Sequence, residues 1–343
     1  MTKKSNLKEV ATLANVGIAT VDRVLNERGG VSVATSHKVL LAARQLNLNR
    51  ILPELYRQPL QIEVILSANK TYFFERLNHY FSQNASGMGY QRIVLHRTLI
   101  SESVPEKLAQ HLERCANQRH GVIVFAQDHP AIYRAIKTCH QQGVAVVTLA
   151  TDLPGAHRLC HVGIDQKQAG GVAGRLMGNM LRSSGEVIMI SGRTDYLAHR
   201  QRIEGFRNVM VRLKPTILLQ NVLVGDDKEE QISQLLQEKL AGSHNVIGIY
   251  NTGAGNRVIS QVMQQFGLAG KCAYITHELH RTTRQLLQQD ILSYTLDQDP
   301  QQQVLLSLQL LLNYLESHQI PDLYQSGKVG LSIYMAENCG DAE

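Results

Sequence analysis

Several short polar segments of this chain carry side chains suited to recognising hydroxyl groups. They contain carboxylates, amides and arginine, and the first also carries the aromatic residues Tyr72, Phe73 and Phe74. Hydroxyl groups need paired hydrogen-bond donors and acceptors, and the C–H faces of a sugar ring stack on aromatic rings. This combination favours a binding site for a small carbohydrate. The segments are NKTYFFE (69–75), QDHP (127–130), TDLP (151–154), RTDYLAHRQR (193–202), YNTGAGN (250–256), THELHRT (276–282) and LDQDP (296–300).

Each segment comes at the end of an apolar run that is typical of a buried strand. Amphipathic helical stretches such as HPAIYRAIKTCHQQ (129–142) separate these runs, a pattern that predicts parallel sheets covered on both faces. Ligands meet such sheets at the carboxyl ends of their strands. Residues 61–343 are too many for one doubly wound sheet, so we expect two lobes. The predicted strands are 61–67, 90–98, 120–126, 145–151, 185–191, 216–224, 245–251, 271–277 and 292–298.

The positive charge of the chain is concentrated at its start. Residues 1–50 hold eight Lys or Arg against three acids, whereas the other 293 residues hold 27 against 26. A small basic module in front of a neutral body indicates a polyanionic partner.

Helical periodicity predicts three short helices in this basic module. The first, NLKEVATLA (6–14), has Asn6 as its N-cap and Glu9 to complete a capping box. The turn NVG (15–17) places Gly17 before a second helix, and a third spans about residues 34–46. Two short helices joined by a tight turn predict a helix-turn-helix, whose second helix enters the major groove of DNA. In that second helix the expected inner stripe is Ile18, Val21, Val24 and Leu25, with Ala19, Asp22, Arg23 and Asn26 facing out.

The sequence LKEVATLANVG followed by ATVDRVLNERGGVS resembles the DNA-binding headpiece of the lactose/galactose repressor (LacI/GalR) family along its whole length. The family pattern matches Val16 to Asn26, and we expect a headpiece over residues 1–47. The resemblance implies that Ile18, Ala19 and Arg23 read bases and that Thr20 contacts a phosphate. Arg23 suits a bidentate pair with guanine, and Ile18 suits apolar contact unless it belongs wholly to the inner stripe. The implied DNA-binding set is Ile18, Ala19, Thr20, Asp22, Arg23 and Asn26.

Two positions depart from the family pattern. Asp22 replaces the small polar residue usual there, and would either accept from cytosine N4 or repel a phosphate. The linker at residues 48–60 lacks the usual hinge sequence, because Pro53 and Pro59 leave room for about one helical turn. Leu52 or Leu55 is a candidate minor-groove wedge, but a plain extended linker is the preferred interpretation.

The order of strands and helices beyond residue 61 resembles the periplasmic-binding-protein-like sensor of the same family. That resemblance implies two doubly wound lobes crossed three times by the chain, over residues 61–162 with 294–322 and residues 163–293 with 323–343. Each implied ligand residue has a structural alternative: Asp128 and Asp152 as helix caps, Arg202 as a surface ion pair, and Phe74 as core. The ligand positions carried over from the family are Phe74, Asp128, Asp152, Arg202, Asn251, Glu278 and Gln298, with Glu278 standing where Asp is more usual.

Other classes of function find little support in the sequence. The five cysteines are scattered without a CxxC pair, so we expect structural thiols and no metal site. We also expect no enzyme and no cofactor, because GxSxG, Walker A and HExxH motifs are all missing. The start of the chain has no signal-like region and no apolar run suits a membrane helix, which favours the cytoplasm.

The preferred interpretation is a homodimeric transcription regulator, a repressor, that binds a pseudo-palindromic operator under the control of a small carbohydrate. The alternatives are a sugar-binding transport component with an N-terminal extension, which a secretion signal would favour, and a nucleotide-cofactor enzyme acting on sugars, which bound cofactor would reveal.

Overall fold

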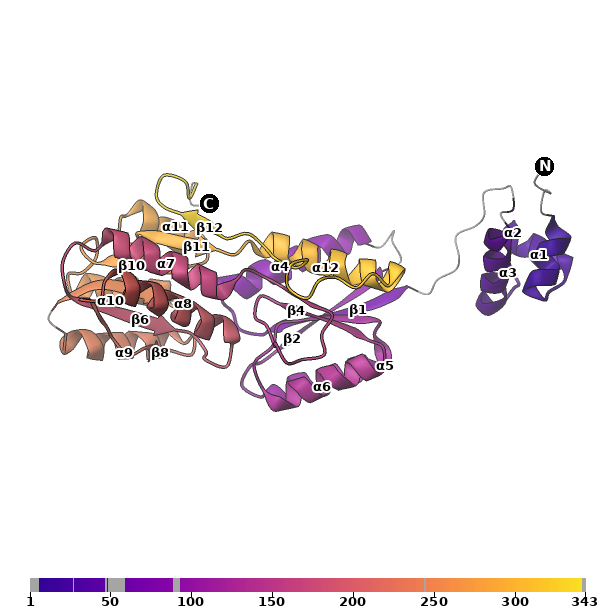
Figure 1. The fold of residues 1–343 in the computed structure, drawn as a ribbon. Coiled ribbons are helices and arrows are strands. Elements are labelled where there is room, and N and C mark those ends of the chain that lie inside the picture. Colours follow the sequence, from indigo (N-terminus) through magenta and orange to yellow (C-terminus); the bar gives the residue numbers. More distant parts are fainter. Residues whose placement is uncertain are drawn as a thin grey trace. The chain divides into compact units, whose positions relative to one another are not determined.

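The computed structural model describes residues 6–26, 28–46, 48, 59–88, 93–243 and 245–340. The chain separates into two compact units, residues 1–60 and 61–343 (Figure 1). The candidate wedge residues Leu52 and Leu55, and nearly all of the expected linker, lie outside the described residues.

The described part of the first unit contains three helices, α1 (Leu7–Ala14), α2 (Ile18–Leu25) and α3 (Val33–Gln45). The predicted capping box of α1 is confirmed, because the Asn6 side chain accepts from the Glu9 backbone N–H while Glu9 accepts from that of Asn6. Asn15, in the left-handed region at φ 51°, ends α1, and Gly17 is the N-cap of α2. The three helices bury a small shared core that includes Val10, Val21, Leu25, Val39, Leu40 and Ala43.

The second unit is built on two sheets, and its first lobe contains a five-stranded sheet in the order β2-β1-β3-β4-β5, in which β1, β3, β4 and β5 run parallel. Helices α5 and α6 pack on one face of this sheet, and α12 lies beside α4 (Figure 1). The strands are β1 (Leu60–Ser67), β2 (Ile93–Ile100), β3 (Gly121–Val124), β4 (Ala145–Leu149) and β5 (Cys160–Val162). The helices are α4 (Tyr72–Met88), α5 (Pro105–Gln118), α6 (Pro130–Gln141) and α12 (Pro300–Ser317).

The second lobe contains a seven-stranded sheet in the order β12-β11-β10-β9-β6-β7, with β8 also paired to β6. Helices α7 and α8 pack on one face and α9, α10 and α11 on the other. Its strands are β6 (Glu186–Ser191), β7 (Leu218–Leu219), β8 (Leu223–Val224), β9 (Val246–Asn251), β10 (Ala273–His277), β11 (Tyr294–Asp297) and β12 (Ser332–Tyr334). Its helices are α7 (Gln166–Met180), α8 (Leu197–Leu213), α9 (Glu229–Ala241), α10 (Asn256–Gln265) and α11 (Arg281–Gln288).

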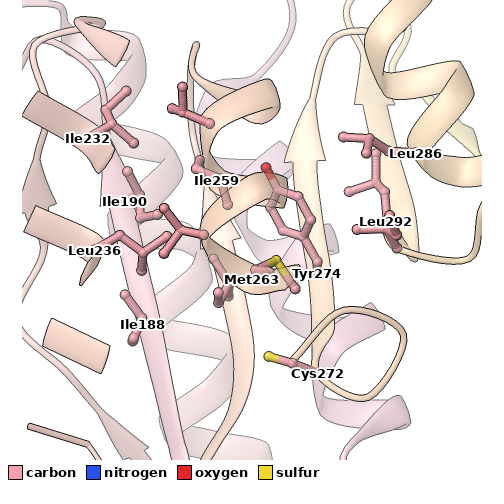
Figure 2. Close-up of a cluster of buried hydrophobic side chains, with 14 of the residues drawn as sticks. Ile188, Ile190, Ile232, Leu236, Ile259, Met263, Cys272, Tyr274, Leu286 and Leu292 are labelled. Carbon is pink, nitrogen blue, oxygen red and sulfur yellow. The ribbon is translucent and has the colours of Figure 1, made fainter. Parts of the chain in front are cut away.

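The core of the second lobe shows why the apolar runs form buried strands. Figure 2 shows Ile188 and Ile190 from β6 packed toward Ile232 and Leu236 of α9, while Tyr274 of β10 lies beside Ile259 and Met263. Strands buried on both faces need apolar side chains at successive positions, as the sequence of β6 provides.

Three expectations about the second unit need correction. The expected first-lobe segment 294–322 begins too early, because β11 pairs with β10 through Ile275↔Tyr294 and the chain returns to the first lobe only after Asp297. The single strand expected over 216–224 is two short strands, β7 and β8, separated by Gln220, Asn221 and Val222. The short strands β5 and β12 were not predicted.

Among the described helices, none has both the length and the apolar character needed to span a membrane.

Candidate functional site

The exposed face of α2 carries the side chains expected to read DNA. Val21, Val24 and Leu25 are buried, whereas Ala19 and Arg23 are exposed. The assignment of Ile18 to the inner stripe is wrong, because its side chain is 45% exposed. Ile18 is the first residue of α2, and the buried stripe of the helix begins three residues later, at Val21. Its exposure leaves it free for the apolar base contact that the resemblance implies.

Asp22 has a partner that the sequence did not predict. Its carboxylate accepts from Arg28 Nη1 at 2.9 Å and from Asn26 Nδ2 at 2.6 Å. The Asp22–Arg28 ion pair lies at the surface, with the two side chains 38% and 64% exposed. It neutralises one positive charge next to the expected DNA-reading face. Thr20 is half-buried and Asn26 exposed, so the whole predicted set lies on or beside this face.

A cavity of about 240 Å³ lies between the two sheets of the second unit. Its walls come from loops at the carboxyl ends of strands, as predicted from the pattern of parallel sheets. Four of the seven candidate ligand residues line it: Phe74, Arg202, Glu278 and Gln298.

Arg202 reaches this cavity because α7 and α8 cross at very short range. A Cβ atom on Gly170 of α7 would lie only 1.9 Å from the Arg202 carbonyl oxygen, so a glycine is required there. The guanidinium is buried, donating from Nε to Gln166 Oε1 at 2.7 Å and from Nη1 to the Thr252 carbonyl at 2.8 Å. Burial lowers the pKa of Arg202, and the nearby Glu278 opposes that shift. The surface ion pair considered as its alternative is therefore wrong.

Glu278 presents a nearly buried carboxyl group on the opposite wall. Its backbone is in the left-handed region at φ 73°. Oε1 accepts from Gln298 Nε2 at 2.6 Å, and Oε2 lies 3.6 Å from Arg76 Nη1. Burial, and next the charge of Asp297, raise the pKa of Glu278 to about 7. This group can therefore exchange a proton near neutral pH.

Aromatic side chains from both lobes complete the cavity wall. Phe74 meets Phe125 edge-on, with ring centroids 4.7 Å apart, and Phe125 meets Tyr196 of the second lobe at the same distance. Tyr72 of α4 stacks on His280 at 4.2 Å and 12°. These contacts give the cavity the apolar faces on which a ring can stack. An ion pair between Arg76 and Asp297, 2.8 Å long, also joins the two lobes.

The other three candidate residues do not line the cavity. Asp128 pairs with Arg200 of α8 at 2.6 Å. Asp152 is buried against Arg158 at 2.7 Å and accepts from Thr148. Asn251 donates to Asn256 Oδ1 and to the carbonyl oxygens of residues 253 and 254, so it holds the loop that forms part of the wall. Neither Asp128 nor Asp152 caps its helix, because His129 is the N-cap of α6 and Asp152 precedes no helix.

The cavity also uses residues that were not selected from the sequence. Phe125, Tyr196, His199 and His277 all line it, together with Asp227 from the second lobe. All but Asp227 lie in or beside segments that the sequence singled out, within a few residues of those selected. Burial lowers the pKa of His199 and of His277, so both imidazoles are neutral near pH 7.

One cluster in the described residues groups three possible metal ligands, away from the cavity. Glu63, His111 and Cys115 place their ligand atoms within 4.8 Å of one another. The Glu63 carboxylate already accepts from Arg119 Nε at 2.8 Å and from Thr98 and His111. These bonds hold the pKa of Glu63 at about 2 against the opposing effect of burial. The arrangement is that of a buried ion pair within the first lobe.

Comparison with known families matches both units. Residues 6–50 match the model of the bacterial regulatory proteins of the lacI family. Residues 62–319, most of the chain, match that of the periplasmic binding protein domain.

Individual relatives agree with this division. The HTH-type transcriptional repressor PurR of Haemophilus influenzae (strain PittEE) is 25% identical over 256 residues, covering 69% of this chain and 70% of the relative. The second unit has the fold of GanP, a glucose-galactose binding protein from Geobacillus stearothermophilus, with a TM-score of 0.74 and 17% identity over 82% of this chain and 99% of that one. A solute-binding protein of Burkholderia graminis C4D1M, in complex with D-arabinose, also has a TM-score of 0.74, with 19% identity, over 82% and 96% of the two chains. The headpiece and the periplasmic-binding-protein domain of the present chain together place it in the lacI family of bacterial regulatory proteins, as a ligand-controlled transcription regulator that binds DNA.

Proposed function

We propose that this regulator senses a small carbohydrate, bound between the two lobes, and that the ligand controls its affinity for an operator. The observation that carries the proposal is the cavity that brings buried Arg202 together with Glu278, Gln298 and aromatic walls. Charged donors, carboxyl and amide acceptors and ring faces are what a sugar requires. The fold neighbours that bind glucose and galactose, or D-arabinose, support the same class of ligand.

The size of the cavity favours one sugar ring. Its volume of about 240 Å³ is below the ~300–1,000 Å³ of pockets that take drug-sized ligands. A monosaccharide or a close derivative is therefore the proposed ligand. Glu278, one methylene longer than Asp, takes up part of that space.

Control of DNA binding follows from contacts that join the lobes. The ion pair between Arg76 and Asp297 and the stack of Tyr72 on His280 link residues of the two lobes. A ligand that touches both walls stabilises the lobe arrangement in which it fits, and shifts the equilibrium only by its difference in affinity for two states.

The DNA-binding half of the proposal rests on the exposed face of α2. Ile18, Ala19 and Arg23 contact bases, Thr20 contacts a phosphate, and Asp22 and Asn26 flank them. One such helix has a small footprint, so the protein binds as a homodimer in the cytoplasm to a pseudo-palindromic site. No catalytic step is proposed.

A thermal-shift screen over pentoses, hexoses, polyols and their phosphates tests the sensor. We expect at least one sugar to raise the Tm of the wild type and to lose that effect in Arg202→Ala, because a buried charged donor is removed. Arg207→Ala is the matched control, since Arg207 is on the same helix but is exposed and lies outside the cavity. An equal response of the two variants to every sugar would contradict the proposed site.

A further inference from the structure

Two consecutive residues of the cavity wall hold buried polar atoms that make no hydrogen bond, although Glu278 Oε2 lies 3.6 Å from Arg76 Nη1. Among the described residues, His277 Nδ1 and Glu278 Oε2 are buried and accept or donate no hydrogen bond. His277 is 1% exposed, and both residues line the cavity. Native structures rarely leave such atoms unpaired, so each one needs an explanation. Because both residues line the cavity, a ligand bound there can supply the missing partners.

The neighbour of His277 fixes which of its ring nitrogens carries the hydrogen. The Tyr250 hydroxyl lies 2.9 Å from His277 Nε2 and is fully buried. Among the described residues it has no other hydrogen-bonding partner, so its O–H donates to Nε2. A neutral imidazole that accepts at Nε2 carries its hydrogen on Nδ1. The unpaired atom of His277 is therefore an N–H donor.

The environment keeps this donor neutral. Burial, followed by the charge of Arg202, lowers the pKa of His277 well below its usual value. Burial also raises the pKa of Tyr250, so its hydroxyl keeps the proton that it donates. At neutral pH the wall thus presents an uncharged N–H beside a carboxyl group.

We propose that His277 is a specificity-determining residue, whose Nδ1–H donates to a ligand hydroxyl oxygen while the carboxyl group of Glu278 hydrogen-bonds the hydroxyl hydrogens of the ligand. The inference rests on the proposed function and extends it. A hydroxyl group both accepts and donates, so it satisfies this wall. A deoxy position offers this wall neither a donor nor an acceptor, so a sugar that lacks the hydroxyl at this position is rejected.

Two substitutions separate the roles of the two ring nitrogens. His277→Gln places an amide near the position of Nε2, which keeps an acceptor for Tyr250 and removes the Nδ1 donor. His277→Asn places its amide N–H near the position of Nδ1, which keeps the donor and loses the contact with Tyr250. Tyr250→Phe removes that contact while leaving the imidazole in place.

The affinity measurement uses the full chain and a panel of D-ribose, D-arabinose, D-xylose, D-glucose, D-galactose, D-allose and D-fucose, with the 2-deoxy derivative of glucose. For the sugar that binds the wild type best, we expect His277→Gln to weaken binding about tenfold. His277→Asn should retain most of the affinity although its Tm falls. A loss of affinity that follows the loss of Tm across all three variants would overturn the proposal.

The position of the hydrogen on the imidazole ring of His277 is measured in the protein without ligand. Nitrogen-15 NMR of the histidine-labelled protein, with His277→Gln as the reference for assignment, should show a neutral Nδ1–H ring from pH 6 to 8. An Nε2–H ring, or a ring that becomes protonated in this range, would refute the inference. Failure of every sugar to bind the wild type would instead count against the proposed function, and the ring spectrum then decides the present inference alone.

Discussion

At the scale of single residues, Asp22 shows how an acid can sit on a surface that binds DNA. Its ion pair with Arg28 cancels both charges, and its second bond holds Asn26 at the end of α2. Neither a cytosine contact nor a phosphate clash has to be assumed for this residue. The pair instead keeps Arg28 from acting as a free cation.

Releasing Arg28 should strengthen binding to DNA of any sequence. Asp22→Asn keeps an acceptor for Asn26 but removes the negative charge, so we expect tighter non-specific binding and a plot of log K against log salt that is steeper by about one phosphate contact. Fluorescence anisotropy over a salt series measures both. Glu204→Gln, an exposed acid of the second unit, is the control. An unchanged slope for Asp22→Asn would mean that Arg28 reaches no phosphate.

Glu278 gives the second unit a characteristic dependence on pH. Its pKa rises from 4.5 in the unfolded chain to about 7 in the fold, so the folded state holds its proton more tightly. The stabilisation is complete below pH 4.5 and is lost as the pH rises to 7. Relative to Glu278→Gln, the wild type should lose about 3 kcal/mol of unfolding free energy over this range.

Urea denaturation at several pH values between 4.5 and 8 measures that difference. Histidines distant from Glu278 contribute alike to both proteins and cancel in the comparison. A difference between the two proteins that stays constant, or that changes in favour of the wild type as the pH rises, would contradict the assignment.

The sequence predicted the kinds of side chain in the cavity better than it predicted which residues line the cavity. Arg202, Glu278 and Gln298 were carried over from the family resemblance, and the cavity confirms that they lie together. Asp128 and Asp152 were carried over in the same way, but each meets an arginine, from α8 and from residue 158, and these pairings depend on tertiary structure. His277 carries its signal only in three dimensions, through burial and an unpaired ring nitrogen.

At the scale of elements, the crossing of α7 and α8 positions the cavity's arginine. Gly170 and Gly205 face each other's helices, since a Cβ on Gly205 would lie 1.9 Å from the Lys167 carbonyl oxygen. Such close backbone approach leaves no room for any side chain. The precise depth of Arg202 in the cavity is therefore set by two glycines.

Adding a methyl group at this crossing should displace α8. We expect Gly170→Ala to lower the unfolding free energy by about 1–3 kcal/mol and to weaken ligand binding. Gly171→Ala is the control, because its Cβ meets Val209 at an ordinary 3.4 Å and alanine favours a helix. Chemical denaturation and ligand titration of both variants test this prediction. If the two variants have the same stability and the same ligand affinity, the helix crossing accommodates the extra methyl group and the prediction is contradicted.

The alternation of strands and helices was predictable because buried strands and amphipathic helices have different periods. Strands β5 and β12 were not predicted because three residues are too few to show a period. The split of residues 216–224 follows from Gln220 and Asn221, which interrupt the apolar run. Gln220 instead bonds Glu186 and Lys239 through its side chain.

At the scale of the whole molecule, the account joins two activities in one chain. The first unit supplies an exposed helix face proposed to read DNA, and the second a cavity lined by residues of both lobes. A regulator needs both, because binding energy at the cavity has to change the affinity for DNA. By reciprocity, DNA must change the affinity for the ligand by the same factor.

The most direct test is an operator titration of the full chain with and without its sugar. The operator is first obtained by selection from random DNA, and the sugar by the thermal-shift screen. The account predicts a two-fold symmetric operator, a change in affinity of about 5–150-fold on adding the sugar, and loss of that change in Arg202→Ala with operator affinity in the absence of sugar preserved. Operator affinity that is the same with and without a sugar known to bind the wild type would contradict the account.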